Sequence, residues 1–304
     1  MERTLDGKVI AVTGGGRGIG REIALLCARE GAAVVVNDLG GSAAGEGADA
    51  APAFEVVHEI ESAGGKALAN VASVADAKGA ESIIDDALRK FGRIDAVVNN
   101  AGILRDRMFF NMSELEWRGV IDTHLHGTFF VSRAAAPYFR EQNSGSFVHF
   151  TSASGLIGNL GQANYAAAKM AVVGLSKSIA LDMERYSVRS NCIAPAAWSR
   201  MIATMPAQTE SERRRVEKLR AMTPAKIAPL VAFLCADASR SVTGQIFAVR
   251  KNEIFLFNAP RPVRAMHRSE GWTPEAIASD LLPAFKTSFQ PLHCSADVFG
   301  WDPI

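Results

Sequence analysis

The sequence predicts an α/β fold: a single domain built on a doubly wound parallel sheet, with helices on both faces and an irregular C-terminal arm. Short runs of consecutive apolar residues alternate with longer segments of helical character. Such unbroken apolar strands are typical of parallel sheets that are buried on both faces. The 304 residues are 48% apolar and 21% charged, which is enough apolar material for a large core. Length alone permits one large domain or two small ones, and no repeat or low-complexity linker divides the chain.

The expected elements follow one another in a regular β-α order. In chain order the predicted strands are Lys8–Thr13, Ala33–Asp38, Lys66–Val71, Ile94–Asn99, Ser146–Ser152, Val188–Ile193 and, as the last strand, Ile246–Val249. The predicted helices run from a glycine-rich turn to about Glu30 and over Phe54–Ala63, Asp76–Phe91, Glu114–Phe139 and Gln162–Tyr186. Apolar residues in the third of these helices recur with a period of about 3.6.

The domain is expected to span residues 1–250, and residues 251–304 form an extension that is not an independent domain. The extension holds six of the twelve prolines and has no clear period. It is either an irregular arm packed on the core or a partner-binding tail. Within the domain, the polar segment at about residues 199–222 is either a loop that closes over substrate or a solvated helix face. Its cationic residues are Arg213, Arg214, Arg215, Lys218 and Arg220.

Composition argues against several classes of function. A net charge of +1 argues against binding to nucleic acid or to a membrane surface. The four cysteines are widely scattered without a C-x-x-C pair, so we expect neither a metal site nor a disulfide framework. No apolar run is long enough for a membrane span, and Met1–Lys8 lacks the apolar region of a secretory signal. We therefore expect a cytoplasmic protein in a reducing compartment.

A glycine-rich turn follows the first predicted strand, with the sequence Thr13-Gly14-Gly15-Gly16-Arg17-Gly18-Ile19-Gly20. Glycines let the backbone approach a pyrophosphate closely, and the N-terminus of the next helix offers free N–H groups to it. The strict G-x-G-x-x-G pattern is absent, whereas T-G-x-x-x-G-x-G fits through Gly14, Gly18 and Gly20. The turn therefore indicates a Rossmann-type dinucleotide site; a tight turn without ligand is the alternative.

Asp38 closes the second predicted strand. A carboxylate at this place accepts hydrogen bonds from the adenosine ribose hydroxyls and repels a 2′-phosphate. No arginine follows it in Leu39-Gly40-Gly41, so NAD is favoured over NADP as the cofactor. The alternative is an aspartate that only forms a turn.

Tyr165 and Lys169 lie four residues apart on one face of a predicted helix. A free tyrosine titrates near pH 10, so its phenolate needs a neighbouring cation in order to exchange protons near neutral pH. Ser152 ends the preceding predicted strand and is placed to hold a substrate oxygen opposite the phenol. The spacing Tyr-x-x-x-Lys is common by chance in surface helices, but together with the serine and the glycine turn it indicates proton-transfer chemistry.

These motifs, with Asn99-Asn100-Ala101-Gly102 between them, resemble the short-chain dehydrogenase/reductase superfamily over about Leu5–Val249. The resemblance implies that Tyr165 is the general acid/base, that Lys169 binds the nicotinamide ribose and lowers the tyrosine pKa, and that Ser152 orients the substrate oxygen. It places Arg17, Ile19 and Asn100 along the cofactor. Relatives often have an aspartate where this chain has Ala72, so Ser73 and Val74 are expected to line the adenine pocket.

A narrower resemblance joins four segments to the (3R)-hydroxyacyl-CoA dehydrogenase part of peroxisomal multifunctional enzyme type 2 and to its stand-alone bacterial relatives. The segments are Val35–Gly41, Asn99–Arg107, Thr151–Lys169 and Ile193–Met201. The resemblance implies NAD-dependent oxidation of a (3R)-3-hydroxyacyl-CoA to a 3-oxoacyl-CoA, in fatty acid or sterol side-chain breakdown. A dehydrogenase for hydroxysteroids or other secondary alcohols is the nearest alternative. A non-catalytic NAD-binding sensor or scaffold is an alternative of another class.

Two further expectations come with the resemblance. His124 stands where most members of the superfamily have an asparagine in a proton relay. Either its side chain or its backbone carbonyl would hold the relay water, and a packed histidine is the alternative. Members of the superfamily associate through two long helices, so a homodimer or homotetramer through Glu114–Phe139 and Gln162–Tyr186 is expected, with a small-molecule substrate, acyl-CoA or steroid, as the other partner.

Overall fold

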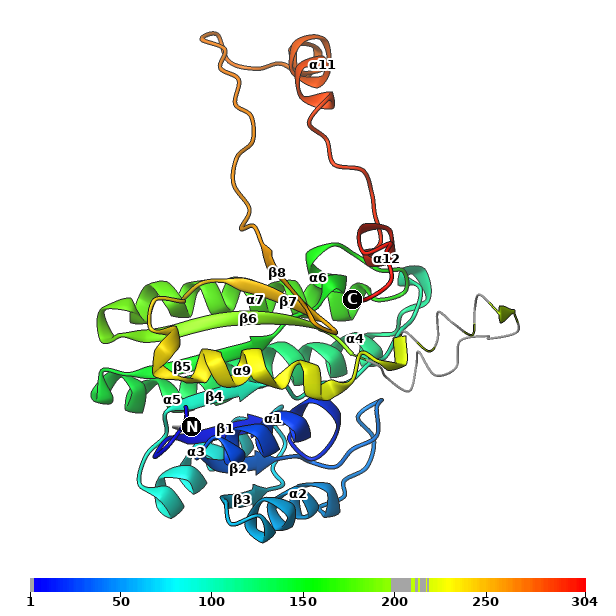
Figure 1. Ribbon diagram of the computed structural model, residues 1–304. Coiled ribbons are helices and arrows are strands. Elements are labelled where there is room, and N and C mark those ends of the chain that lie inside the picture. The colour runs from blue at the N-terminus through cyan, green and yellow to red at the C-terminus, as the bar shows by residue number, and fades with distance from the viewer. Residues whose placement is uncertain (1–2, 198–208, 211–212, 214–216, 218) are drawn as a thin grey trace.

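The computed structural model describes residues 3–197, 209–210, 213, 217 and 219–304. Within these residues the strands form one eight-stranded sheet with the order β3-β2-β1-β4-β5-β6-β7-β8 (Figure 1). The strands are β1 Val9–Thr13, β2 Ala33–Asn37, β3 Lys66–Asn70, β4 Ala96–Asn99, β5 Gly145–Phe150, β6 Val188–Ala196, β7 Ile246–Arg250 and β8 Glu253–Phe257. The pairs from β3 to β7 are parallel, which confirms the predicted doubly wound sheet.

Helices cover both faces of this sheet, as predicted. On one face α1, α2 and α9 pack over a core that includes Ile10, Val34 and Val98; on the other face α3, α5 and α7 enclose Val97, Phe139 and Phe147. The main helices are α1 Gly18–Arg29, α2 Ala51–Ser62, α3 Ala77–Phe91, α4 Glu114–Ile121, α5 Gly127–Gln142, α6 Ala153–Leu156, α7 Ala163–Met183 and α9 Ala228–Cys235. Among the described helices, none is long and apolar enough to cross a membrane.

The predicted strand Ile246–Val249 is present as β7, but the prediction that it is the last strand was wrong, because β8 follows it. β8 pairs antiparallel with β7 and forms the edge of the sheet. Its alternate residues Phe255 and Phe257 pack against Phe299, and Phe255 also contacts Trp301, so the strand is stabilised by residues near the chain end. That support is distant in sequence, and the exposure of alternate residues in β8 differs from the complete burial of β1, β2 and β4.

The rest of the C-terminal arm projects from the body of the molecule before it returns (Figure 1). It contains the short helices α10 Pro274–Ala276, α11 Leu282–Lys286 and α12 Ser295–Val298, and a π-helical turn at Ile277–Leu281. Large apolar side chains along the arm are exposed, including Val263, Phe289 and Leu292. The arm returns to the domain at α12, where Ser295 N donates to Gly158 O at 2.9 Å.

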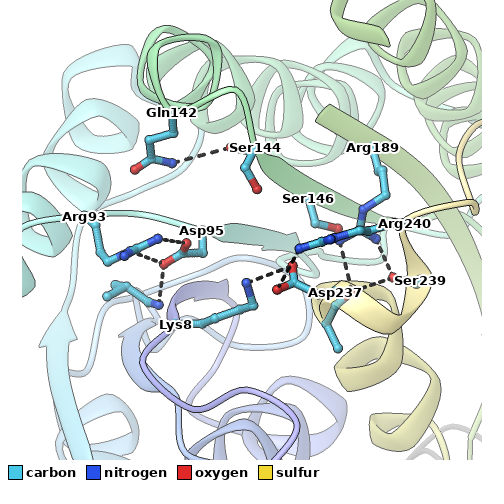
Figure 2. A network of polar contacts seen from close by, with 12 residues as sticks. Lys8, Arg93, Asp95, Gln142, Ser144, Ser146, Arg189, Asp237, Ser239 and Arg240 are labelled. Atoms are coloured by element: carbon cyan, nitrogen blue, oxygen red, sulfur yellow. Dashed lines mark hydrogen bonds and ion pairs between the residues drawn. The ribbon is translucent and has the colours of Figure 1, made fainter. Parts of the chain in front are cut away.

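A polar network ties the amino ends of the central strands to α9 (Figure 2). Arg189, at the start of β6, is 7% exposed and donates to the carbonyls of Leu234 at 2.6 Å and Ala236 at 3.2 Å and to Ser239 Oγ. A buried guanidinium at the carboxyl end of a helix meets carbonyls that lack helical partners and the negative end of the helix dipole. Arg189 therefore holds α9 against the sheet.

Replacing Arg189 by methionine should lower the free energy of unfolding by about 2–4 kcal/mol, because three buried acceptors lose their charged donor. Urea denaturation measures this change. The control is Arg240→Met, because Arg240 is largely exposed and pairs only at the surface with Asp237. Equal stability of the two variants would contradict the role given to Arg189.

Candidate active site

A cavity of about 500 Å³ lies beyond the carboxyl ends of β1, β2 and β4. In a doubly wound sheet this is the crevice in which ligands bind. Six of the residues predicted to bind a cofactor line it: Gly14, Arg17, Asp38, Ser73, Val74 and Asn100. Gly18, Ile19 and Gly20 form the first residues of α1 beside it.

The turn after β1 requires glycine for two reasons, a positive φ at two positions and a close backbone approach at a third. Gly14 and Gly18 have φ angles of +63° and +53°, and a Cβ on Gly20 would lie 2.0 Å from the carbonyl oxygen of Gly14. Asn100 Nδ2 donates to the carbonyls of Thr13 and Gly14 at 3.0 Å each, which fixes the turn against β4. No side chain caps the start of α1, so its N–H groups are available to a phosphate. These residues fit a dinucleotide.

Asp38 reaches the same cavity, with its carboxylate held by the backbone. Its Oδ2 accepts from Gly16 N at 2.8 Å and its Oδ1 from Gly40 N at 2.7 Å. The aspartate thus forms a turn, as one sequence interpretation had it, and it also lines the cavity. Each oxygen keeps a lone pair with which a ribose hydroxyl can bond.

The loop after β2 crosses the cavity and is fixed on its far side. Leu104 N donates to Ala43 O at 3.0 Å, and Arg105 Nε donates to Ala44 O at 2.9 Å. The sequence does not predict a role for this loop. The glycine content at Gly40–Gly47 predicts a turn-rich loop. Its hydrogen bonds with residues 104–105 are long-range contacts that no local pattern reveals.

Ser152, Tyr165 and Lys169 come together at the carboxyl end of β5. Lys169 is 4% exposed, its Nζ donates to Phe150 O at 2.6 Å, and the same nitrogen lies 5.5 Å from the centre of the Tyr165 ring. Ser152 caps α6 and lies half-buried within hydrogen-bonding reach of the phenol. The helical spacing and the strand end therefore place the three groups where the sequence predicted them.

The protein alone does not acidify the phenol. Burial raises the pKa of Tyr165; the hydrogen bond with Ser152 lowers it, and the negative charge of Asp106 raises it. Burial also lowers the pKa of Lys169 to about 7. A stable phenolate near neutral pH therefore requires a further positive charge next to Tyr165, such as an oxidised nicotinamide.

The predicted helix Glu114–Phe139 is interrupted at His124. A π-helical turn at Asp122–His126 separates α4 from α5, and such turns occur often at functional sites. The turn directs His124 inward, where its ring meets Tyr165 edge to face with 5.1 Å between ring centres. A Cβ on Gly102 would lie 2.2 Å from His124 Cε1, so the glycine of the Asn-Asn-Ala-Gly motif makes room for this ring.

His124 is buried and uncharged. Burial and the nearby Lys169 hold its pKa well below the usual value. Its Nε2 lies 2.8 Å from the carbonyl oxygen of Ile103 and 3.1 Å from the amide nitrogen of the same residue, so this ring nitrogen can donate to the one or accept from the other. Nδ1 is a buried ring nitrogen without a protein partner among the described residues.

Of the polar segment at about residues 199–222, the structure describes residues 209–210, 213, 217 and 219–222. Arg214, Arg215 and Lys218 of its cationic cluster lie outside the described residues. In the described part of the chain, no group of three or more His, Cys, Asp or Glu side chains is arranged to hold a metal ion.

Comparisons with known proteins decide the family. A family model described as enoyl-(acyl carrier protein) reductase matches residues 14–251. A short-chain type dehydrogenase/reductase of Mycobacterium tuberculosis is 50% identical over 230 residues, which are 76% of this chain and 78% of the relative. The chain belongs to the short-chain dehydrogenase/reductase family. It is an oxidoreductase of this family that acts on CH–OH groups, as the sequence predicted.

Other relatives carry more specific names. A hydroxyacyl-CoA dehydrogenase of Mycobacterium tuberculosis is 38% identical over 295 residues, covering 92% of this chain and 89% of the relative. Peroxisomal multifunctional enzyme type 2 of Mus musculus is 42% identical over 274 residues; the match covers 90% of this chain but only 36% of the mouse protein. The crystal structure of a short chain dehydrogenase from Mycobacterium avium superposes with a TM-score of 0.82 at 38% identity, covering 95% of this chain and 98% of that chain.

Proposed function

We propose that the chain oxidises a (3R)-3-hydroxyacyl-CoA to the 3-oxoacyl-CoA with NAD as cofactor. The observation that carries this proposal is the meeting of Tyr165, Lys169 and Ser152 beside a cavity whose glycine turn fits a dinucleotide. The substrate class is supported by the hydroxyacyl-CoA dehydrogenase among the relatives and by the multifunctional enzymes.

Each residue has a separate task in the proposed reaction. When bound, the nicotinamide of NAD⁺ accepts the hydride that leaves the carbinol carbon of the substrate. Tyr165 accepts the hydroxyl proton of the substrate, and Ser152 donates a hydrogen bond to the same oxygen. Lys169, hydrogen-bonded to the Phe150 carbonyl, would bind the nicotinamide ribose and hold a positive charge 5.5 Å from the centre of the Tyr165 ring.

A substrate panel tests this function. With NAD⁺, (3R)-3-hydroxyacyl-CoA thioesters should give NADH, while the (3S) thioesters should give little. Comparing straight-chain with sterol-derived acyl groups identifies the acyl class. Turnover of free hydroxysteroids but not of thioesters would favour the alternative dehydrogenase.

Tyr165→Phe should lower kcat by at least about a hundredfold with NAD⁺ affinity preserved, since a general acid/base contributes roughly 10²–10⁴ in rate.

The preference for NAD over NADP is assigned to Asp38. Asp38→Asn keeps one oxygen for the backbone and removes the charge that repels a 2′-phosphate. We expect the ratio of kcat/KM for NAD⁺ to that for NADP⁺ to fall by about tenfold to a hundredfold. Glu46→Gln, which removes a carboxylate elsewhere in the same loop, is the control. An unchanged ratio in Asp38→Asn would mean that another group selects the cofactor.

His124 is proposed to serve the proton path through its side chain. The free Nδ1, buried next to Tyr165, can hold a water between the phenol and solvent, as an acceptor in one tautomer and as a donor in the other. His124→Phe keeps a ring at this place but removes the nitrogen that would hold the water. The variant should lower kcat about tenfold and increase the solvent isotope effect, because proton transfer then becomes slower. The control is His126→Ala, an exposed histidine in the same turn. Identical kinetics in His124→Phe would assign the relay to the backbone.

We also propose an oligomeric state, a role for residues 251–304 and a cellular location. Exposed apolar side chains on the long helices support a homodimer or homotetramer: Leu115 and Trp117 on α4, Phe129 on α5, and Met170 and Leu181 on α7.

Residues 251–304 are proposed to be a partner-binding extension that depends on the 1–250 domain, since β8 completes the sheet of that domain and the projecting part is exposed. Free thiols at Cys27, Cys192, Cys235 and Cys294 support a cytoplasmic, reducing location.

A further inference from the structure

A second layer of polar residues lies behind Ser152. Ser154, in α6, is 5% exposed and is the centre of this layer. Its Oγ lies 3.2 Å from Ser152 Oγ, 2.8 Å from Gln162 Oε1 and 2.8 Å from Asn159 Nδ2. One hydroxyl thus meets three side chains, one of which is a candidate catalytic group.

The donors and acceptors around Ser154 can be assigned by elimination. Gln162 Nε2 donates to the Asp106 carboxylate at 2.8 Å, so the oxygen of this amide faces Ser154 and can only accept. Ser154 therefore donates its single proton to Gln162. Asn159 Nδ2 can only donate, and it uses one lone pair of Ser154. The last lone pair is left for Ser152, whose hydroxyl must be the donor in that contact.

The C-terminal arm supplies the start of this chain of hydrogen bonds. Ser295, at the beginning of α12, donates through Oγ to Asn159 Oδ1 at 2.8 Å and through its backbone N–H to Gly158 O at 2.9 Å. Donation then passes from Asn159 to Ser154, from Ser154 to Gln162, and from Gln162 to the charged Asp106. A chain that runs in one direction and ends on a carboxylate has bonds that polarise one another.

We infer that Ser154 is a positioning residue for Ser152, and that the C-terminal arm helps to set it through Ser295. The inference rests on the proposed function, in which Ser152 holds the substrate oxygen. Ser152 Oγ accepts from Ser154 N–H at 3.1 Å and donates to Ser154 Oγ, so its place is fixed before substrate arrives. Rotation about its Cβ–Oγ bond turns the proton from Ser154 to the substrate oxygen. The site is thereby preorganised at the atom where charge develops.

A double-mutant cycle between Ser152 and Ser154 tests the inference in the full chain. Ser154→Ala should lower kcat about tenfold and change KM by less than about twofold, since the lost interaction matters mainly in the transition state. In the Ser152→Ala background the same substitution should have no further effect on kcat, because Ser154 acts only through Ser152. NAD⁺ affinity should be the same in all four proteins.

Four further variants complete the test: one controls for stability and three test the role of the arm. Ser176→Ala removes another buried, hydrogen-bonded hydroxyl and should leave kcat unchanged. Ser295→Ala should lower kcat about twofold to threefold by loosening Asn159, as expected for one outer hydrogen bond. Ser295→Thr, which keeps the hydroxyl, should restore the rate, and Ser279→Ala on the projecting part of the arm should have no effect.

The outcomes separate the inference from the function on which it rests. A wild-type chain that does not oxidise (3R)-3-hydroxyacyl-CoA thioesters would overturn the proposed function itself. A fully active Ser152→Ala enzyme would overturn the role proposed for Ser152 and, with it, the inference. An impaired Ser152→Ala enzyme with normal Ser154→Ala kinetics, or an equal loss from Ser154→Ala in both backgrounds, would overturn the inference alone. Equal rates for Ser295→Ala and Ser295→Thr would overturn the part assigned to the arm.

Discussion

The burial of one lysine beneath one phenol is the interaction on which the rest of the site depends. Lys169 is almost fully enclosed, and its ammonium has the Phe150 carbonyl as its fixed partner. Desolvation lowers the lysine pKa to about 7 and raises that of Tyr165, so the pair in isolation resists the charges that proton transfer needs. A bound cationic ring would reverse this balance for the phenol, which couples acid/base chemistry to the presence of oxidised cofactor.

The sheet makes that arrangement possible because it brings distant segments to one edge. The carboxyl ends of β1 and β4 carry the glycine turn and Asn100, and the end of β5 leads into Ser152. Glycines at positions 14, 20 and 102 leave the space that the neighbouring turn, Asn100 and His124 occupy. Far from this edge, the polar network around Arg189 fixes the opposite ends of the strands (Figure 2).

The sequence predicted the parallel sheet and its helical layers from local periodicity, and it predicted that Tyr165 and Lys169 share a helix face from their spacing. The sequence predicted Ser152 beside them from its place at the end of a strand and from the family resemblance. It could not predict β8, whose packing needs Phe299 and Trp301 from the chain end. Nor could it predict the π-turn that directs His124 inward. The same holds for the hydrogen-bonded chain in which Gln162 links Ser154 to Asp106 and Asn159 links Ser154 to Ser295. Those features arise from contacts between residues that are far apart in the chain, and a periodic pattern carries no information about them.

The pKa of Tyr165 with and without NAD⁺ tests the central claim most directly. The chain has three tyrosines, Tyr138, Tyr165 and Tyr186, so a Tyr138→Phe/Tyr186→Phe protein labelled with ¹³C at the tyrosine ζ-carbon reports on Tyr165 alone by NMR titration. The account predicts a pKa above the free value of about 10 in the protein alone and a value lowered by several pH units when NAD⁺ is bound. A pKa that NAD⁺ leaves unchanged would contradict it.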